Sequence, residues 1–178
     1  MPLYKQFFKS LHSPKHIAAF RLQGIGKTIQ YLFALAFLMS LPAFIAVILY
    51  MAAGNSAAKE TVEEMLPLLT INQETTQQNA FIVVPAALFL YYILLSFMLF
   101  LKASVFAGAG LFMVSVLKKR GEYRHLFRMA AYALSLPAFL TTLTELAHWT
   151  FPYVYAVDWL LIAVMLFLSI RYLPGALK

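Results

Sequence analysis

The chain alternates between long apolar runs and shorter polar or basic segments. A helix needs about 20 apolar residues to cross the hydrocarbon core of a bilayer. Four segments meet or approach this length, and we expect each to cross the membrane; they cover residues 29–53, 80–102, 129–148 and 156–173. The pattern therefore predicts an all-α fold, a polytopic transmembrane helical bundle with four crossings.

The apolar stretch that begins at residue 80 is longer than one crossing requires, which leaves two interpretations. In the first, 80–117 is one long or broken helix whose far end lies at the inner interface. In the second, 103–117 is a fifth, short crossing, which would place the basic segment 118–128 outside. Gly108 and Gly110 mark the place where a break would be least costly, because glycine has no Cβ.

The beginning of the chain is basic and predicts a segment that lies on the membrane surface. Its apolar residues recur at helical spacing, and they are Leu3, Tyr4, Phe7, Phe8 and Leu11. This arrangement is typical of an interfacial amphipathic helix. Ser13 and Pro14 then supply an N-cap and a first-turn proline for a second short helix, which reaches about Leu22. We expect 1–28 to be a cytoplasmic, interfacial segment and 29–178 to form the bundle.

The charges indicate how the chain is oriented. Residues 1–27 carry five lysines and arginines and no acid, and 118–128 carry five against one glutamate. The segment 54–79 has one lysine and four glutamates. Because lysine and arginine accumulate in cytoplasmic loops, we expect both termini and 118–128 inside and 54–79 outside. The aromatic stretch 149–159 then lies at the outer interface.

Composition narrows the class of function. Apolar residues make up 62% of the chain and charged residues 12%, and 178 residues are too few to bury so much apolar surface in a soluble fold. There is no cysteine, and neither paired catalytic carboxylates nor a Ser–His arrangement is visible. The GIGKT sequence at 24–28 lacks the first glycine of a phosphate-binding loop. We therefore expect a protein that is not an enzyme and has no metal or cofactor. We attribute its net charge of +7 to membrane orientation rather than to nucleic-acid binding.

Two sets of residues are candidates for function. The first is a set of basic residues that we expect to contact the anionic inner leaflet, a protein partner or a second copy of the chain. It comprises Lys5, Lys9, Arg21, Lys27, Lys118, Lys119, Arg120, Arg124 and Arg128. The second lies at the outer end of the third crossing, where Glu145 and His148 are neighbours on one helix face and Thr141 is one turn earlier. An ionisable residue within a span is a candidate functional residue. The alternatives are a hydrogen-bonded glutamate without a function, a proton or ion site, and a metal site that would need further carboxylates.

Two segments resemble a family of uncharacterised bacterial membrane proteins, some of which are labelled maltodextrose utilisation protein MalA. They read YKQFFKSLHSPKHIAAFRLQGIGKTIQYLFAL and EYRHLFRMAAYALSLPAFL. The second is also similar, more remotely, to the Yip-type membrane-protein superfamily, in which an arginine, a tyrosine and a proline open a late span, here Arg128, Tyr132 and Pro137. The resemblance implies a domain of unknown function, without catalytic residues to transfer. The label implies association with a carbohydrate (maltodextrin) importer of the ABC type.

These observations lead to two hypotheses. The first is a non-enzymatic integral scaffold or accessory subunit of a bacterial plasma membrane, associated with such an importer. The alternative is a small oligomeric transporter or channel that uses the polar residues of the 129–148 span.

Overall fold

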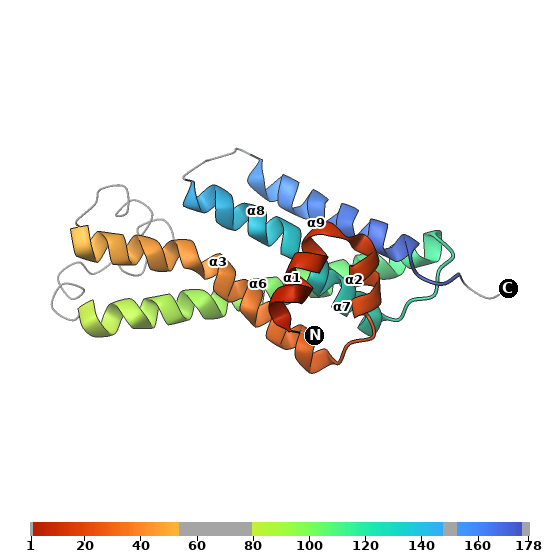
Figure 1. Cartoon of the computed structure of the whole chain (residues 1–178), viewed down its shortest axis with the longest axis horizontal. Helices are drawn as coiled ribbons and strands as arrows, with labels where there is room; N and C mark the ends of the chain where they lie inside the picture. The colour runs from red at the N-terminus through yellow and green to blue at the C-terminus, as the bar shows by residue number, and fades with distance from the viewer. Residues whose placement is uncertain (1, 54–79, 148–152, 176–178) are drawn as a thin grey trace.

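The computed structural model describes residues 2–53, 80–147 and 153–175, and the fold over these residues is helical. The long helices lie along one common axis, and the two short N-terminal helices cross them (Figure 1). In chain order the helices are α1 (Leu3–His12), α2 (Pro14–Phe20), α3 (Ile25–Ala53), α6 (Ala80–Val116), α7 (Tyr123–Ala133), α8 (Ser135–Leu146) and α9 (Val154–Arg171).

Among the described residues, three helical segments are long and apolar enough to cross a membrane. They are Ile25–Leu49, Ile82–Val116 and Tyr123–Leu146, the last of which combines α7 and α8. The chain is therefore a membrane protein with an all-helical fold, as the apolar runs predicted. The fourth expected crossing, 156–173, coincides with α9, which has 18 residues and is not one of these three.

Helix α6 decides between the two interpretations of the long apolar stretch. It is a single helix of 37 residues, and at about 1.5 Å per residue it is roughly 55 Å long. The alternative interpretation, a separate crossing over 103–117, is therefore excluded, and the helix continues through Gly108 and Gly110 without a break. Gly110 faces α7, and a Cβ at this position would be in ordinary van der Waals contact, 3.4 Å from the side chain of Leu126.

The third apolar segment is bent. Helix α7 ends at Ala133 and α8 begins at Ser135, with Leu134 between them. Pro137 has no N–H to donate to the carbonyl of Ala133, so the regular helical hydrogen bonding is interrupted at this place. The bend lies at the point where α1 reaches the bundle, and it positions the polar groups described below.

The loop between α6 and α7 is shorter than the inner loop predicted over 118–128. Helix α7 begins at Tyr123, since its first turns bury Leu126 completely and gain packing energy as a helix. The loop that remains is tied to the end of the chain, because the backbone N–H of Arg120 donates to the carbonyl of Pro174 at 3.1 Å. The ends of α6, α7 and α9 therefore come together at one end of the bundle.

The main core is built around α7. Its residues from Met129 to Ala133 are completely buried, and they pack with residues of α2, α3, α6, α8 and α9. A second, smaller cluster joins only α3 and α6, where these helices extend past α8 and α9 (Figure 1). Its buried members are Ala43, Ala46, Val47, Ala87 and Leu88.

Candidate functional site

Helix α1 lies against the bundle with a polar face. Its buried residues are Gln6 and Ser10, whereas Tyr4 and Phe8 are 60% and 66% exposed. The amphipathic pattern predicted that the apolar face of α1 is directed to the membrane. It did not predict that Gln6 and Ser10, on the polar face, are buried against the rest of the protein.

The two buried polar side chains of α1 meet hydroxyl groups from α3 and from the bend between α7 and α8. Ser10 Oγ lies 2.8 Å from Ser135 Oγ and 3.0 Å from Tyr31 OH, and Tyr31 OH is also hydrogen-bonded to Ser135 Oγ. Tyr132 OH lies 2.8 Å from Gln6 Oε1. Ser135 Oγ also donates to the backbone carbonyl of Tyr132 at 2.6 Å, which joins these two groups of contacts. We refer to the connected set as the buried polar cluster, which comprises Gln6, Ser10, Gln23, Tyr31, Tyr132 and Ser135.

Tyr132 is at the centre of this cluster. Its hydroxyl also lies 3.0 Å from Gln23 Oε1, so it donates its proton to one of two amide oxygens at a time. Its ring packs against Phe20 and Tyr31, with centroid separations of 4.7 and 4.4 Å. A buried polar group that loses its partner costs about 1–3 kcal/mol. The partners of Tyr132 come from α1, from the turn after α2 and from α3, and the cluster therefore fixes these segments relative to α7.

Two side chains of α7 bind the end of α2. Arg128 Nη1 donates to the carbonyl oxygen of Arg21 at 2.7 Å, and His125 Nδ1 lies 3.1 Å from the same oxygen. The last carbonyls of a helix lack intrahelical partners, and basic side chains satisfy them. Arg128, which the sequence placed among the residues for a partner or lipid, is therefore used inside the protein.

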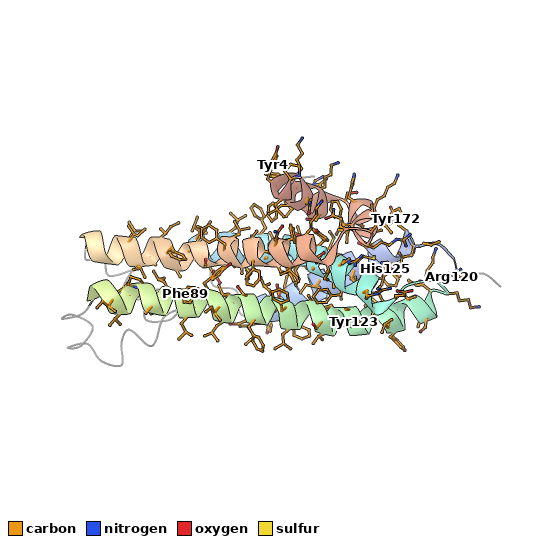
Figure 2. All side chains as sticks on the ribbon, turned by 90° about the horizontal axis from the view of Figure 1, so that it is seen from below. Tyr4, Phe89, Arg120, Tyr123, His125 and Tyr172 are labelled. Atoms are coloured by element: carbon orange, nitrogen blue, oxygen red, sulfur yellow. The ribbon has the colours of Figure 1, made fainter. Side chains whose placement is uncertain are left out.

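The other basic residues of the predicted set differ in exposure. Arg124 forms an exposed ion pair with Glu122 at 2.9 Å, and this contact lowers the pKa of the Glu122 carboxyl. Figure 2 places Arg120 at the end of the bundle, away from α1. Exposed members are Lys5, Lys9, Lys27, Lys118, Arg120 and Arg124, while Arg21 and Lys119 are partly buried. We use the term inner surface for the exposed residues of α1, α2 and the loop 117–122, after the cytoplasmic location predicted for them from the charges.

The structure describes only part of the second predicted set. Thr141 Oγ1 donates to a carbonyl four residues earlier at 2.5 Å, and Thr142 and Thr144 also bond carbonyls of α8. Glu145 is partly buried, and His148 lies outside the described residues, so their pairing stays a prediction. Over the same ranges there is no group of three His, Cys, Asp or Glu residues that could hold a metal ion.

One ion pair inside the bundle was not predicted from the sequence. Lys102 Nζ of α6 lies 2.6 Å from Asp158 Oδ2 of α9, and the two side chains are 26% and 8% exposed. Charged residues within membrane spans pair with one another as a rule. Asp158 lies inside the fourth predicted crossing, and its charge is opposite to that of Lys102. The predicted orientation, however, places Lys102 at the inner end of the crossing 80–102 and Asp158 at the outer end of the crossing 156–173, so the predicted crossings did not indicate this contact.

Comparison with protein families identifies the group to which the chain is related. A family profile described as a protein of unknown function, DUF1189, matches residues 4–80 and 72–170. The chain belongs to the DUF1189 family. The match covers every member of the buried polar cluster, and it confirms the expected relation to a family of unknown function. No curated protein and no solved structure matches the chain, and the MalA label and the Yip-type similarity stay predictions.

Proposed function

We propose that this DUF1189 protein is a non-enzymatic scaffold or accessory subunit of a bacterial plasma membrane, with four crossings and both termini in the cytoplasm. As the fourth crossing, α9 would be about 27 Å long at 1.5 Å per residue, close to the hydrocarbon thickness of about 30 Å. This arrangement leaves the basic residues 1–27 and the loop 117–122 on the cytoplasmic side, where such residues accumulate.

One observation carries the proposal. The buried polar cluster joins α1 to the bundle through side chains that contact one another, and Arg128 and His125 hold the end of α2. The interior polar groups of this region therefore support a rigid inner surface. Rigid surfaces bind partners with a smaller loss of conformational entropy than mobile segments do.

The charge of the inner surface indicates the kind of partner. Helices α1 and α2 contain lysines and no acidic residue, and their exposed aromatic residues include Phe8. We expect a membrane-associated protein that presents an acidic surface with an apolar centre, since complementary charge steers association. The resemblance noted above makes a maltodextrin importer of the ABC type the first candidate.

Photocrosslinking tests this proposal at single positions. A benzophenone amino acid is placed at Phe8 or at Arg120, both on the inner surface, and for comparison at Tyr155, which is 83% exposed at the opposite end of α9. We expect the first two positions to yield the same crosslinked protein in native membranes and Tyr155 not to yield it. Crosslinks to a second copy of the chain alone, or none at Phe8 and Arg120, would contradict the accessory role.

A second candidate function, a small oligomeric transporter or channel, is favoured by the ion pair between Lys102 and Asp158. Ionisable residues inside membrane spans often mark ion or proton pathways. Against this candidate, the hydroxyls of the predicted Thr141 site bond carbonyls of their own helix. Ion flux through vesicles that contain only this chain would favour the second candidate, and we expect no flux above that of empty vesicles.

A further inference from the structure

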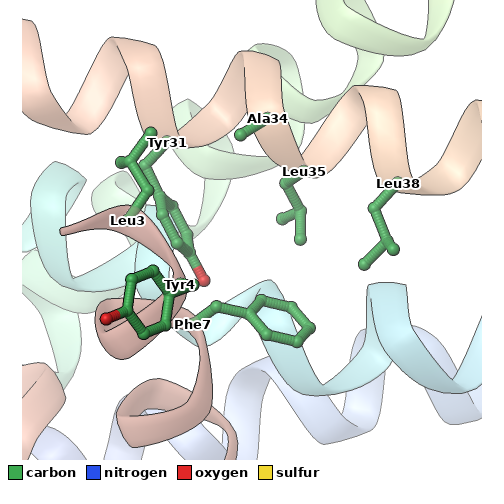
Figure 3. Close-up of a pocket in the computed structure, with 7 residues that line it drawn as sticks. All are labelled: Leu3, Tyr4, Phe7, Tyr31, Ala34, Leu35 and Leu38. Atoms are coloured by element: carbon green, nitrogen blue, oxygen red, sulfur yellow. The ribbon is translucent and has the colours of Figure 1, made fainter.

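An apolar pocket lies between α1 and α3, beside the buried polar cluster (Figure 3). Its volume is about 190 Å³. The side chains that line it include Leu3, Tyr4 and Phe7 of α1 and Tyr31, Leu35 and Leu38 of α3. Enclosed apolar cavities of about 150 Å³ bind small hydrocarbons, and this pocket is of similar size but is open on one side. The pocket therefore has the size and the lining for part of a hydrocarbon chain.

Cationic side chains lie beside this pocket. Lys5 Nζ is 6.0 Å from the centroid of the Tyr4 ring, which lines the pocket. Lys27 is exposed and precedes Tyr31 by one turn of α3, on the helix face that continues to Leu38. From Lys27 to Leu38 the helix rises by about 16 Å. A molecule with an anionic head and an apolar tail matches this order of charged and apolar groups.

We propose that the pocket binds one acyl chain of an anionic phospholipid of the cytoplasmic leaflet, with the lipid phosphate close to Lys5 and Lys27. This inference rests on the orientation proposed above, in which the start of α3 lies at the inner interface. The headgroups of that leaflet are then the anions nearest to both lysines, and its acyl chains surround α3. A lipid therefore reaches the pocket without leaving its own leaflet.

The buried polar cluster prepares the site before the lipid binds. Tyr31 belongs both to the pocket wall and to the cluster, where its hydroxyl contacts Ser10 and Ser135. Helix α1 is thereby held at a fixed distance from α3, and the space between them is not filled by α1 itself. The groups that bind α1 to the bundle thus also form the lipid site.

The test uses the full-length chain in lipid nanodiscs. Phosphatidylglycerol or phosphatidylcholine carries a photoactivatable diazirine in its acyl chain, and labelled peptides are identified by mass spectrometry. We expect phosphatidylglycerol to label the peptides that contain Leu3–Phe7 and Tyr31–Leu38 more strongly than phosphatidylcholine does.

Each basic residue near an anionic surface contributes about 1 kcal/mol, so Lys27→Gln should lower the preference for phosphatidylglycerol about fivefold. Lys15→Gln, an exposed lysine on α2, is the matched control.

Occupation of the pocket is tested by a change of volume. Ala34 lines the pocket, and Ala34→Phe fills it, whereas Ala109→Phe adds the same volume at an exposed position of α6. We expect the first variant to abolish the labelling of these peptides and the second to leave it unchanged. Labelling that survives Ala34→Phe overturns the pocket assignment, and equal labelling by the two lipids overturns the anionic headgroup. Neither result changes the outcome expected from the crosslinking experiment at Phe8 and Arg120. A failure of the lipid site can therefore be distinguished from a failure of the proposed accessory role.

Discussion

Replacing Asp158 with alanine is expected to destabilise the protein by about 2–3 kcal/mol, because the change leaves the charge of Lys102 unpaired inside the bundle. The cost should be below that of a fully enclosed charge, since the Lys102 side chain is 26% exposed and its flexible stem can move the ammonium group outward. The measurement is reversible unfolding in mixed micelles at increasing fractions of sodium dodecyl sulfate, followed by helical circular dichroism.

Two controls separate the loss of the pair from the loss of packing. In the double variant Lys102→Met and Asp158→Leu, both charges are removed, and we expect most of the stability to return. In Glu122→Ala, an exposed ion pair with Arg124 is removed, and the change should stay within about 0.5 kcal/mol. A single Asp158→Ala variant that unfolds like the unmodified chain would show that the two groups do not stabilise the α6–α9 contact.

The second large effect is expected at Tyr132. Tyr132→Ala removes a completely buried ring and the hydroxyl at the centre of the buried polar cluster, and it should cost about 3–5 kcal/mol. Tyr132→Phe keeps the ring and removes only the hydroxyl, and its cost should be about 1 kcal/mol, within the range measured for hydrogen bonds inside membrane proteins. Both values come from the same unfolding measurement.

We also expect Tyr132→Ala to release the N-terminal helices from the bundle. The chain has no cysteine, so single cysteines report the accessibility of chosen sites. Ala18→Cys on α2 is 6% exposed and should react slowly with a maleimide in the otherwise unmodified chain and rapidly in the Tyr132→Ala variant. Ala19→Cys, at the exposed neighbouring position, should react rapidly in both. Equally slow reaction of Ala18→Cys in both backgrounds would mean that Tyr132 does not hold α2 in place.

Local pattern was sufficient to predict the two N-terminal helices and the two longest helices. The apolar runs predicted α3 and α6, and Ser13 and Pro14 separate α1 from α2 as expected, although the Ser13 side chain makes no capping hydrogen bond. Hydrophobic periodicity also found an amphipathic α1. It could not reveal that Gln6 and Ser10 are buried, because periodicity assigns the polar face of a helix to water and contains no information about polar partners elsewhere in the chain.

Long-range contacts account for most of what the sequence did not reveal. Arg128 binds a carbonyl oxygen that lies 107 residues earlier in the chain, and Lys102 and Asp158 are 56 residues apart. A basic residue near the membrane has the same local sequence signature whether it faces lipid or caps another helix. The length of α7 was underestimated for a related reason, since Leu126 favours a helix only when α6 and the rest of the core are present to bury it.

Above all, we expect α1, α2 and the loop 117–122 to lie together on the cytoplasmic side of the membrane. The most direct test is the reaction of single cysteines with a membrane-impermeant maleimide on intact cells and again after permeabilisation. Arg120→Cys and Phe8→Cys should react only after permeabilisation, whereas Tyr155→Cys should react on intact cells. Labelling of Arg120→Cys on intact cells would contradict this expectation, because it would place the basic loop on the outer side.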